Sequence, residues 1–241
     1  ARPELRPDGA DDAGADDAGP TMEPEAPADG DGGEADAIGP GAIGAVKKKV
    51  AALKDVVRSA EKRRAAFVDM LVAEDADRVR PLSDGLDKAE KLTSDVHKAA
   101  ADKLDGMLPL DGMVGDPMVL NISEALLGGP LAWQADRAEY EAVDGGVEIR
   151  LPGGVTYKAV ASDGDWKLRL NESQREIAEL LRADVNGQVK VLSELLAGIR
   201  SGKIANDRQA GDAAQSLAKK HILPHRRKGM KKAAPTMGMP M

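Results

Sequence analysis

EYEAVDGGVEIRLPGGVTYKAVASDGDWKLRL, residues 139–170, contains four short runs in which apolar and polar residues alternate. This period of two is typical of β-strands that have one buried and one solvated face. The runs are separated by Asp-Gly-Gly at 144–146, Pro-Gly-Gly at 152–154 and Asp-Gly at 163–164, which favour tight turns. The sequence therefore predicts a four-stranded antiparallel meander over residues 138–170, apolar on one face and charged on the other.

A sheet with one apolar face needs a cover, and the preceding segment carries amphipathic helix patterns. Apolar residues three and four positions apart predict a long helix over 45–74. Asp-Ala-Asp at 75–77 predicts a break and then a short helical turn at 78–82, followed by a second helix over 85–104. One or two further helical turns are expected over 119–127.

Two more helices are expected after the meander, within residues 172–222. Asn171 or Ser173 is expected to cap the first and Asn206 the second, because short polar side chains accept hydrogen bonds from the free N–H groups at helix starts. Gly187 lies inside the first of these helices and indicates a bend there.

Together these elements predict an α+β fold, in which a four-stranded antiparallel meander packs against amphipathic helices, with two extra C-terminal helices and disordered tails. The folded domain is expected to span residues 45–222. Four of the few aromatic residues and one leucine are expected between the sheet and the helices, and they are also the candidate ligand pocket: Phe67, Tyr140, Tyr157, Trp166 and Leu168.

Charge is unevenly distributed along the chain, whose formal net charge is −7. Residues 1–44 are acidic and rich in Ala, Gly, Pro and Asp, whereas residues 223–241 are basic and rich in Met. Neither segment has enough apolar residues to offset the entropy of ordering, so both are predicted to be disordered. The basic residues near the C-terminus either are simply solvated or contact an anionic surface such as nucleic acid or lipid: Lys219, Lys220, Arg226, Arg227, Lys228, Lys231 and Lys232.

The composition excludes several kinds of chemistry. The chain has no cysteine, which rules out disulfides, thiolate metal sites and a cysteine nucleophile. No apolar run approaches the ~20 residues of a membrane span. His97, His221 and His225 lack the spacing of a metal site, since Pro224 separates the last two. The sequence therefore predicts no catalytic residue, no metal and no cofactor.

Two segments are similar to parts of one superfamily. Residues 66–79, AFVDMLVAEDADRV, resemble its first helix, and residues 160–168, VASDGDWKL, resemble its closing hairpin. Over roughly residues 46–170 the chain thus resembles the nuclear transport factor two-like superfamily, particularly its small bacterial secreted or lipoprotein-like members. The resemblance implies a cone-like α+β fold. Enzymes of the superfamily place Asp or His inside the cone, and no residue of this chain matches such a motif.

We expect a non-enzymatic binding or interaction module that presents a helix-backed sheet to a protein partner or a small apolar ligand. Two alternatives stay open: an isomerase-like or dehydratase-like enzyme with a cone-shaped pocket, and weak binding of anionic polymers through the basic tail. The resemblance, and a chain that begins at Ala1 instead of Met, favour an extracytoplasmic protein (periplasmic, secreted or lipid-anchored) over a cytoplasmic one.

Overall fold

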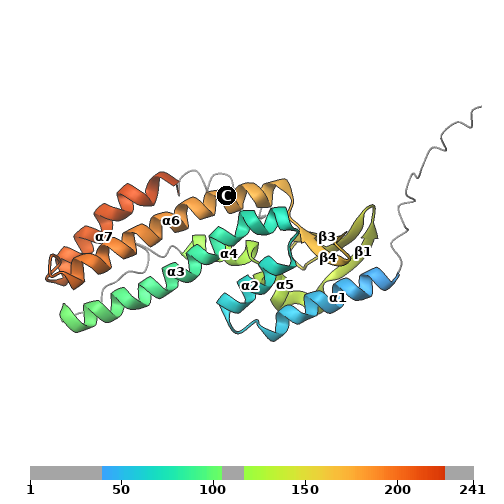
Figure 1. The fold of residues 1–241 in the computed structure, drawn as a ribbon, viewed down its shortest axis with the longest axis horizontal. Coiled ribbons are helices and arrows are strands. Elements are labelled where there is room, and N and C mark those ends of the chain that lie inside the picture. Colours follow the sequence, from blue (N-terminus) through green and yellow to red (C-terminus); the bar gives the residue numbers. More distant parts are fainter. Residues whose placement is uncertain (1–39, 105–116, 226–241) are drawn as a thin grey trace, which may run out of the picture. The chain divides into compact units, whose positions relative to one another are not determined.

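The computed structural model describes residues 40–104 and 117–225 (Figure 1). In this part of the chain, five α-helices and a short 3-10 helix come first: α1 Pro40–Asp55, α2 Ala60–Met70, α3 Ala73–Lys103, α4 Pro117–Leu126, α5 Gly129–Gln134 and η1 Ala135–Arg137. Four strands follow: β1 Glu139–Val143, β2 Gly146–Arg150, β3 Thr156–Ser162 and β4 Asp165–Arg169. Helices α6 Glu172–Arg200 and α7 Asp207–His221 complete an arrangement of the expected α+β class.

The four strands form one antiparallel sheet in the order β1-β2-β3-β4, which confirms the predicted meander. In the turn between β3 and β4, Asp163 and Gly164 both have positive φ, 52° and 75°. Two such residues give a turn whose twist matches that of the flanking strands. The resulting register pairs Ala159 with Leu168 and Ala161 with Trp166, so alternate residues of both strands share one face.

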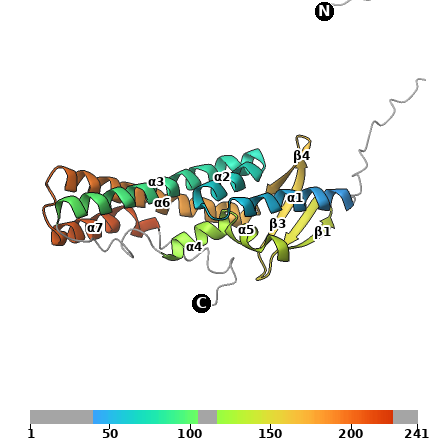
Figure 2. The same ribbon diagram turned by 90° about the horizontal axis from the view of Figure 1, so that it is seen from below.

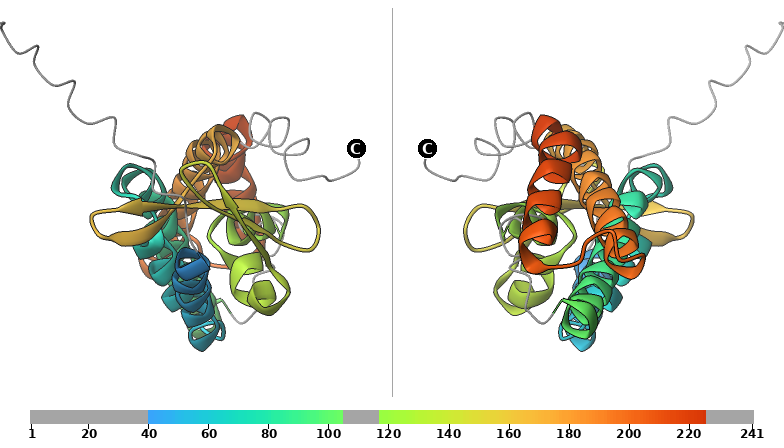
Figure 3. Two further views of the ribbon diagram at one scale, coloured as in Figure 1. Left: turned by 90° about the vertical axis from the view of Figure 1, so that its right-hand side faces the viewer. Right: turned by 90° about the vertical axis from the view of Figure 1, so that its left-hand side faces the viewer.

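The inward face of the sheet, which carries Ile149, Tyr157, Ala159 and Leu168, is buried against helices. Helices α1 and α5 lie on the same side of the sheet (Figure 3), and α1 and α2 contact its strands. Phe67 of α2 meets Tyr157 edge-on, with the ring centroids 6.1 Å apart and the planes at 71°. Amphipathic helices therefore cover the apolar face of the sheet, as the sequence predicts.

The described helices extend slightly further at both ends of the chain than expected. Helix α1 begins at Pro40, so residues 40–44, expected to be disordered, are helical. Proline suits this first position because the N–H that it lacks would have no partner within the helix. Residues 223–225 also have helical backbone. The remaining residues expected to be disordered, 1–39 and 226–241, lie outside the described part of the chain.

The single helix expected over 45–74 is wrong, because two helices, α1 and α2, occupy this segment. Ser59 caps the start of α2 with its hydroxyl oxygen. Arg63, in the first turn of α2, donates a hydrogen bond of 2.8 Å to the carbonyl oxygen of Val57 and so holds the connection between the two helices. The break depends on this side-chain contact, since no glycine or proline lies between residues 55 and 60.

The break expected at 75–77 is also wrong, since α3 runs without interruption through Pro81 and Gly85. The chain instead leaves the helical path at Leu71, which forms a parallel bridge with β4. Helix α3 packs along α6 (Figures 1 and 2), and at Gly85 an added Cβ would lie 2.9 Å from a methyl group of Val185. Packing against α6 thus outweighs the helix-breaking tendency of the local sequence.

Helix α4 forms where one or two helical turns were expected, and α5 and η1 follow it before the sheet. Gly128 precedes α5 with φ at +79°, and an added Cβ there would lie 2.3 Å from the ring of Phe67. The close approach of backbone to ring requires glycine at this position.

Helix α6 contacts both α3 and α7, and the three helices share a second apolar cluster built from leucine, isoleucine, valine and alanine. Asn171 caps α6 in a complete capping box with Gln174, and Asn206 caps α7, as predicted. Gly187, where the sequence indicated a bend, lies at the contact between α6 and α7. A Cβ added there would lie 2.3 Å from the carbonyl oxygen of His221, so α7 ends directly against the backbone of α6.

Candidate functional site

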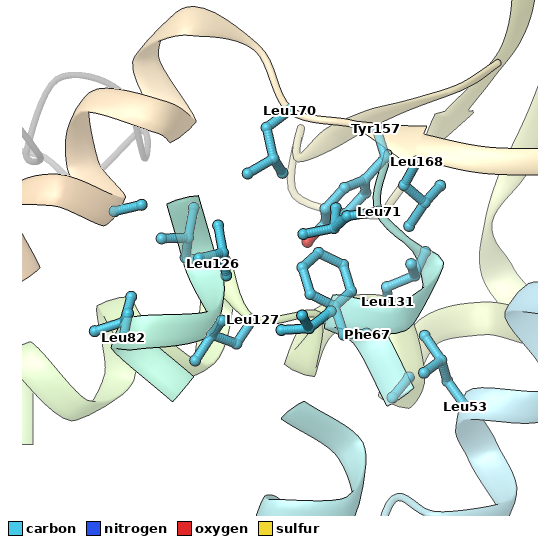
Figure 4. Close-up of a cluster of buried hydrophobic side chains, with 14 of the residues drawn as sticks. Leu53, Phe67, Leu71, Leu82, Leu126, Leu127, Leu131, Tyr157, Leu168 and Leu170 are labelled. Carbon is cyan, nitrogen blue, oxygen red and sulfur yellow. The ribbon is translucent and has the colours of Figure 1, made fainter. Parts of the chain in front are cut away.

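The five residues predicted to line a ligand pocket lie between the sheet and the helices. Phe67, Tyr157 and Leu168 are no more than 2% exposed and belong to the main apolar cluster. The side chains of this cluster pack between the sheet and the helices (Figure 4). Tyr140 and Trp166 pack against the margin of the same cluster. The expectation that these residues form the sheet–helix interface is therefore confirmed.

Tyrosine and lysine side chains complete this interface with polar contacts. The Tyr157 hydroxyl donates a hydrogen bond of 3.2 Å to the carbonyl oxygen of Ala125, and burial raises the pKa of that hydroxyl. Lys47 lies over the ring of Tyr140, with its ammonium 5.1 Å from the ring centroid. Burial, and then the charge of Asp136, raise the pKa of Tyr140. Both phenols therefore stay protonated at neutral pH.

A shallow pocket of about 200 Å³ lies at the start of α6, beside the outward face of the sheet. Residues on that face alternate with the buried ones, so they project away from the covering helices. Most of its lining surface is apolar, although most of the residues that line it have polar side chains: Glu148, Thr156, Tyr157, Lys158, Arg169, Leu170, Asn171 and Gln174. Only Tyr157 is shared with the set predicted from the sequence.

The charged residues of this pocket form one row across three neighbouring strands. The sheet register places Glu148 opposite Lys158, and Lys158 opposite Arg169. Like charges on directly opposite residues repel each other. The Lys158 ammonium leans away and donates a hydrogen bond of 2.8 Å to the carbonyl oxygen of Asp144. Arg169 is exposed and lies beside the pocket.

The acidic member of the row is already paired. Glu148 accepts a hydrogen bond from Arg150 Nε, and Arg150 Nη1 lies 2.8 Å from a carboxylate oxygen of Glu141. The hydrogen bond to Glu148, together with the charges of Glu141 and Glu148, raises the pKa of the Arg150 guanidinium. One guanidinium, that of Arg150, thus serves the carboxylates of both Glu148 and Glu141.

The two amides at the start of α6 use their oxygens within the capping box. Asn171 Oδ1 accepts from Gln174 N at 2.8 Å, and Gln174 Oε1 accepts from Asn171 N at 2.9 Å. An amide side chain has one oxygen and one NH₂ group. The capping box therefore leaves the NH₂ groups of both side chains, Nδ2 and Nε2, as the donors that they bring to the pocket.

Of the basic residues singled out in the sequence, Lys219 and Lys220 do not line this pocket. Lys219 and Lys220 are exposed in the last turn of α7. The other five, Arg226, Arg227, Lys228, Lys231 and Lys232, lie outside the described residues.

The three histidines lie on α3, at the end of α7 and four residues further on. His97 is partly buried on α3, and His225 is exposed just after α7. His221 Nε2 lies 3.3 Å from Glu194 Oε1, close enough for an ion pair when the imidazole is protonated. Over residues 40–104 and 117–225, no cluster of three acidic or histidine side chains is arranged to hold a metal ion. Within the same ranges, no helix combines the length and the apolar character that crossing a membrane requires.

A buried ionic cluster joins α2, α3 and α4 away from the pocket. Arg64 is 1% exposed and donates to Asp87, to Glu90 at 3.0 Å and to Glu124 at 2.8 Å. Burial by itself lowers the pKa of this guanidinium, but the hydrogen bonds to Glu90 and Asp87, together with the charges of these carboxylates, outweigh it and raise the pKa. All the donor nitrogens of Arg64 bind carboxylates of the protein, so we assign the cluster a structural role.

Apart from Tyr157, the pocket residues were not predicted from the sequence, because each polar one could be explained as a charged strand position or a helix cap. One feature of the sequence does indicate part of the pocket, namely the Asp-Gly turn at 163–164. It sets the register of the last hairpin and so places Lys158 opposite Arg169. Asn171 and Gln174 reach the pocket only because of the direction in which α6 extends from the sheet. The local sequence does not specify this direction.

Comparison of the chain with protein-family models, with curated proteins and with solved structures gave no match. The resemblance to the nuclear transport factor two-like superfamily therefore stays a prediction.

Proposed function

We propose that this protein is a non-enzymatic interaction module in which helices hold a small sheet so that the outward face of the sheet meets a partner. One observation carries the proposal, namely the difference between the two faces. The inward face packs into the main apolar cluster, and the outward face carries charged side chains beside a pocket. A face already packed with side chains stabilises the fold, whereas exposed polar groups around a hollow are available for recognition.

The alternative, an isomerase-like or dehydratase-like enzyme, is less well supported. Such an enzyme needs an acid or a histidine inside an apolar cavity between the sheet and the helices. At that position the molecule has Phe67, Leu71 and Leu131, each no more than 2% exposed. We therefore do not extend the proposal to catalysis.

The proposal also includes the relationship to the nuclear transport factor two-like superfamily and a location outside the cytoplasm. The order of the elements, helices before a four-stranded meander, supports the relationship. A chain without cysteine is compatible with an oxidising compartment. Recovery of the chain from cell fractions, after expression of its complete gene, tests the location.

Thiol footprinting tests whether the outward face is covered by a partner. The chain has no cysteine, so single cysteines report on chosen positions without background. Thr156→Cys and Glu139→Cys place exposed thiols on the outward face, and Gln215→Cys places one on the exposed face of α7 as the control. Each full-length variant is labelled with a fluorescent maleimide in buffer and in extract of the cells that produce the protein.

We expect the extract to slow labelling severalfold at residues 139 and 156 but not at residue 215. Equal labelling at the three positions, or protection confined to residue 215, would show that the sheet is not the contact surface. Circular dichroism of each variant establishes that the fold is retained.

A further inference from the structure

We propose that the pocket at the start of α6 binds a single carboxylate group, held by Arg169 and by the amide NH₂ groups of Asn171 and Gln174. This inference depends on the proposed function, because it names the chemistry that the outward face of the sheet recognises. It applies to a free carboxylate and to an acidic side chain of a partner peptide alike, and the experiment below separates these sources.

The first argument is the balance of donors and acceptors around the pocket. The capping box occupies the side-chain oxygens of Asn171 and Gln174, so these residues contribute N–H donors. Arg169 contributes further donors and a positive charge, and Thr156 contributes a hydroxyl. The remaining acceptor, the Glu148 carboxylate, is engaged by Arg150. The polar groups of the lining are thus mainly donors, which suits a ligand that only accepts hydrogen bonds, as an ionised carboxylate does.

The second argument is electrostatic. Lys158 and Arg169 occupy directly opposite positions in the sheet, an arrangement that costs free energy through repulsion. Glu148, opposite Lys158 on the other side, and the hydrogen bond from the Lys158 ammonium to the Asp144 carbonyl oxygen relieve only part of it. An anion beside Arg169 would compensate the rest. Arginine is suited to this role because its planar guanidinium can bind both oxygens of a carboxylate.

The third argument is size. The pocket holds about 200 Å³, which is smaller than the roughly 300–1,000 Å³ of sites that enclose a drug-sized ligand. One carboxylate and the short carbon chain behind it fit this space. The pocket would then hold one acidic residue of a longer segment that lies across the charged face.

Fluorescence anisotropy of a fluorescein-labelled hexaglutamate peptide against the full chain tests the inference, with labelled hexaglutamine as the uncharged control. Arg169→Gln removes the cation. Asn171→Asp and Gln174→Glu exchange donors for acceptors, yet Asp is as good a cap as Asn and Glu completes a capping box as well as Gln. These two variants should therefore keep the melting temperature of the wild type while they change the pocket.

Matched controls are available on α7, which lies outside the pocket. Asn206→Asp and Gln209→Glu make the same chemical changes at its capped start, where Asn206 Oδ1 accepts from Gln209 N. Arg208→Gln removes an exposed arginine from the same helix. Each control matches one pocket variant in the charge that it adds or removes.

We expect the wild type to bind hexaglutamate but not hexaglutamine. Each pocket variant should weaken binding at least about tenfold, the loss that follows when a charge-assisted hydrogen bond is removed or becomes repulsive. The α7 variants should bind like the wild type. Acetate added at constant ionic strength displaces the peptide if the pocket takes free carboxylates, and leaves it bound if a peptide must carry the group. Either result supports the carboxylate chemistry.

Unchanged binding in the three pocket variants would overturn the inference, and so would equal binding of the two peptides. Loss of binding only when Lys219 and Lys220 are replaced by Gln would move the contact to the basic C-terminal region and also overturn it. If hexaglutamate does not bind while Thr156→Cys is still protected in extract, the carboxylate assignment fails and the interaction module remains.

Discussion

The carboxylate of Asp75 and the guanidinium of Arg175 form a two-point ion pair, although the residues are 100 positions apart in the chain. Arg175 Nε lies 2.7 Å from Oδ1 and Nη2 lies 3.3 Å from Oδ2, which also accepts from Leu170 N at 2.8 Å. Asp75 is fully buried. One side chain thus ties the start of α3 to the end of β4 and to the start of α6.

Asp75→Ala is expected to lower the free energy of unfolding by about 3 kcal/mol, because it leaves the buried N–H of Leu170 and the Arg175 guanidinium without their acceptor. Asp75→Asn should cost less, since its amide oxygen can still accept from Leu170. Urea titrations followed by circular dichroism measure both. A loss below about 1 kcal/mol for the alanine variant would mean that the pair contributes no more than an exposed one.

Gly187→Ala should loosen the contact between α6 and α7. The added methyl carbon would lie 2.3 Å from the His221 carbonyl oxygen, and overpacking of this kind costs about 1–3 kcal/mol. Gly211→Ala is the control, because nothing lies within 4 Å of a Cβ at that position in α7. The control should be neutral or stabilising by up to about 1 kcal/mol. Equal effects of the two substitutions in thermal melts would contradict a close helix contact at Gly187.

Arg64→Ala should be among the most damaging single substitutions in the described part of the chain, at about 3–5 kcal/mol, because three carboxylates lose their shared buried partner. Arg64→Lys should recover only part of this loss, since one ammonium does not reproduce the fork of a guanidinium. Arg208→Ala, at an exposed position, should stay within about 0.5 kcal/mol of the wild type. Stability of Arg64→Ala close to that of Arg208→Ala would exclude a structural role for the cluster.

The ion pair between Lys49 and Asp165 predicts a small acid-dependent contribution to stability. The hydrogen bond from Lys49, followed by that from the backbone N–H of Trp166, holds the pKa of Asp165 below its ordinary 3.8. A carboxyl whose pKa is lower in the folded state stabilises the fold above the unfolded-state pKa, and this stabilisation is lost as pH falls through the folded-state pKa.

Asp165→Asn should therefore be less stable than the wild type at neutral pH, with a difference that shrinks below about pH 3.8. The difference should be modest, because both partners are partly exposed and screened by water. Urea midpoints of the two proteins, measured from neutral to acid pH, check the sign. A difference that grows as the pH falls would contradict the assigned pairing.

The sheet and the last two helices could be predicted because their signals are local. Alternation and an Asp-Gly turn specify the hairpins, and Asn171 and Asn206 mark helix starts through hydrogen bonds to their own neighbours. The boundaries of the N-terminal helices could not be predicted, because contacts beyond the local sequence determine them. Arg63 reaches back to Val57 between α1 and α2, and α6 keeps α3 intact across Pro81.

For the pocket, the sequence indicated the charged outward face but not the hollow in it. Two of its lining residues come from a helix whose position relative to the sheet is set by the buried Asp75–Arg175 pair. That pair joins segments far apart in the chain, so neither the periodicity nor the composition of the sequence predicts it. On the inward face, Phe67 and its neighbours pack into the main apolar cluster, because the few aromatic side chains help to fill the core.

The shared use of Asn171 and Gln174 has an evolutionary consequence. Asn and Asp codons differ by a single nucleotide, and so do those of Gln and Glu. A point mutation of either kind would preserve the start of α6, and with it protein abundance in the cell, while it filled the pocket with negative charge. If the pocket recognises a carboxylate, as we propose, lineages that no longer need this contact can lose it without misfolding, and acidic residues at these two positions would mark them.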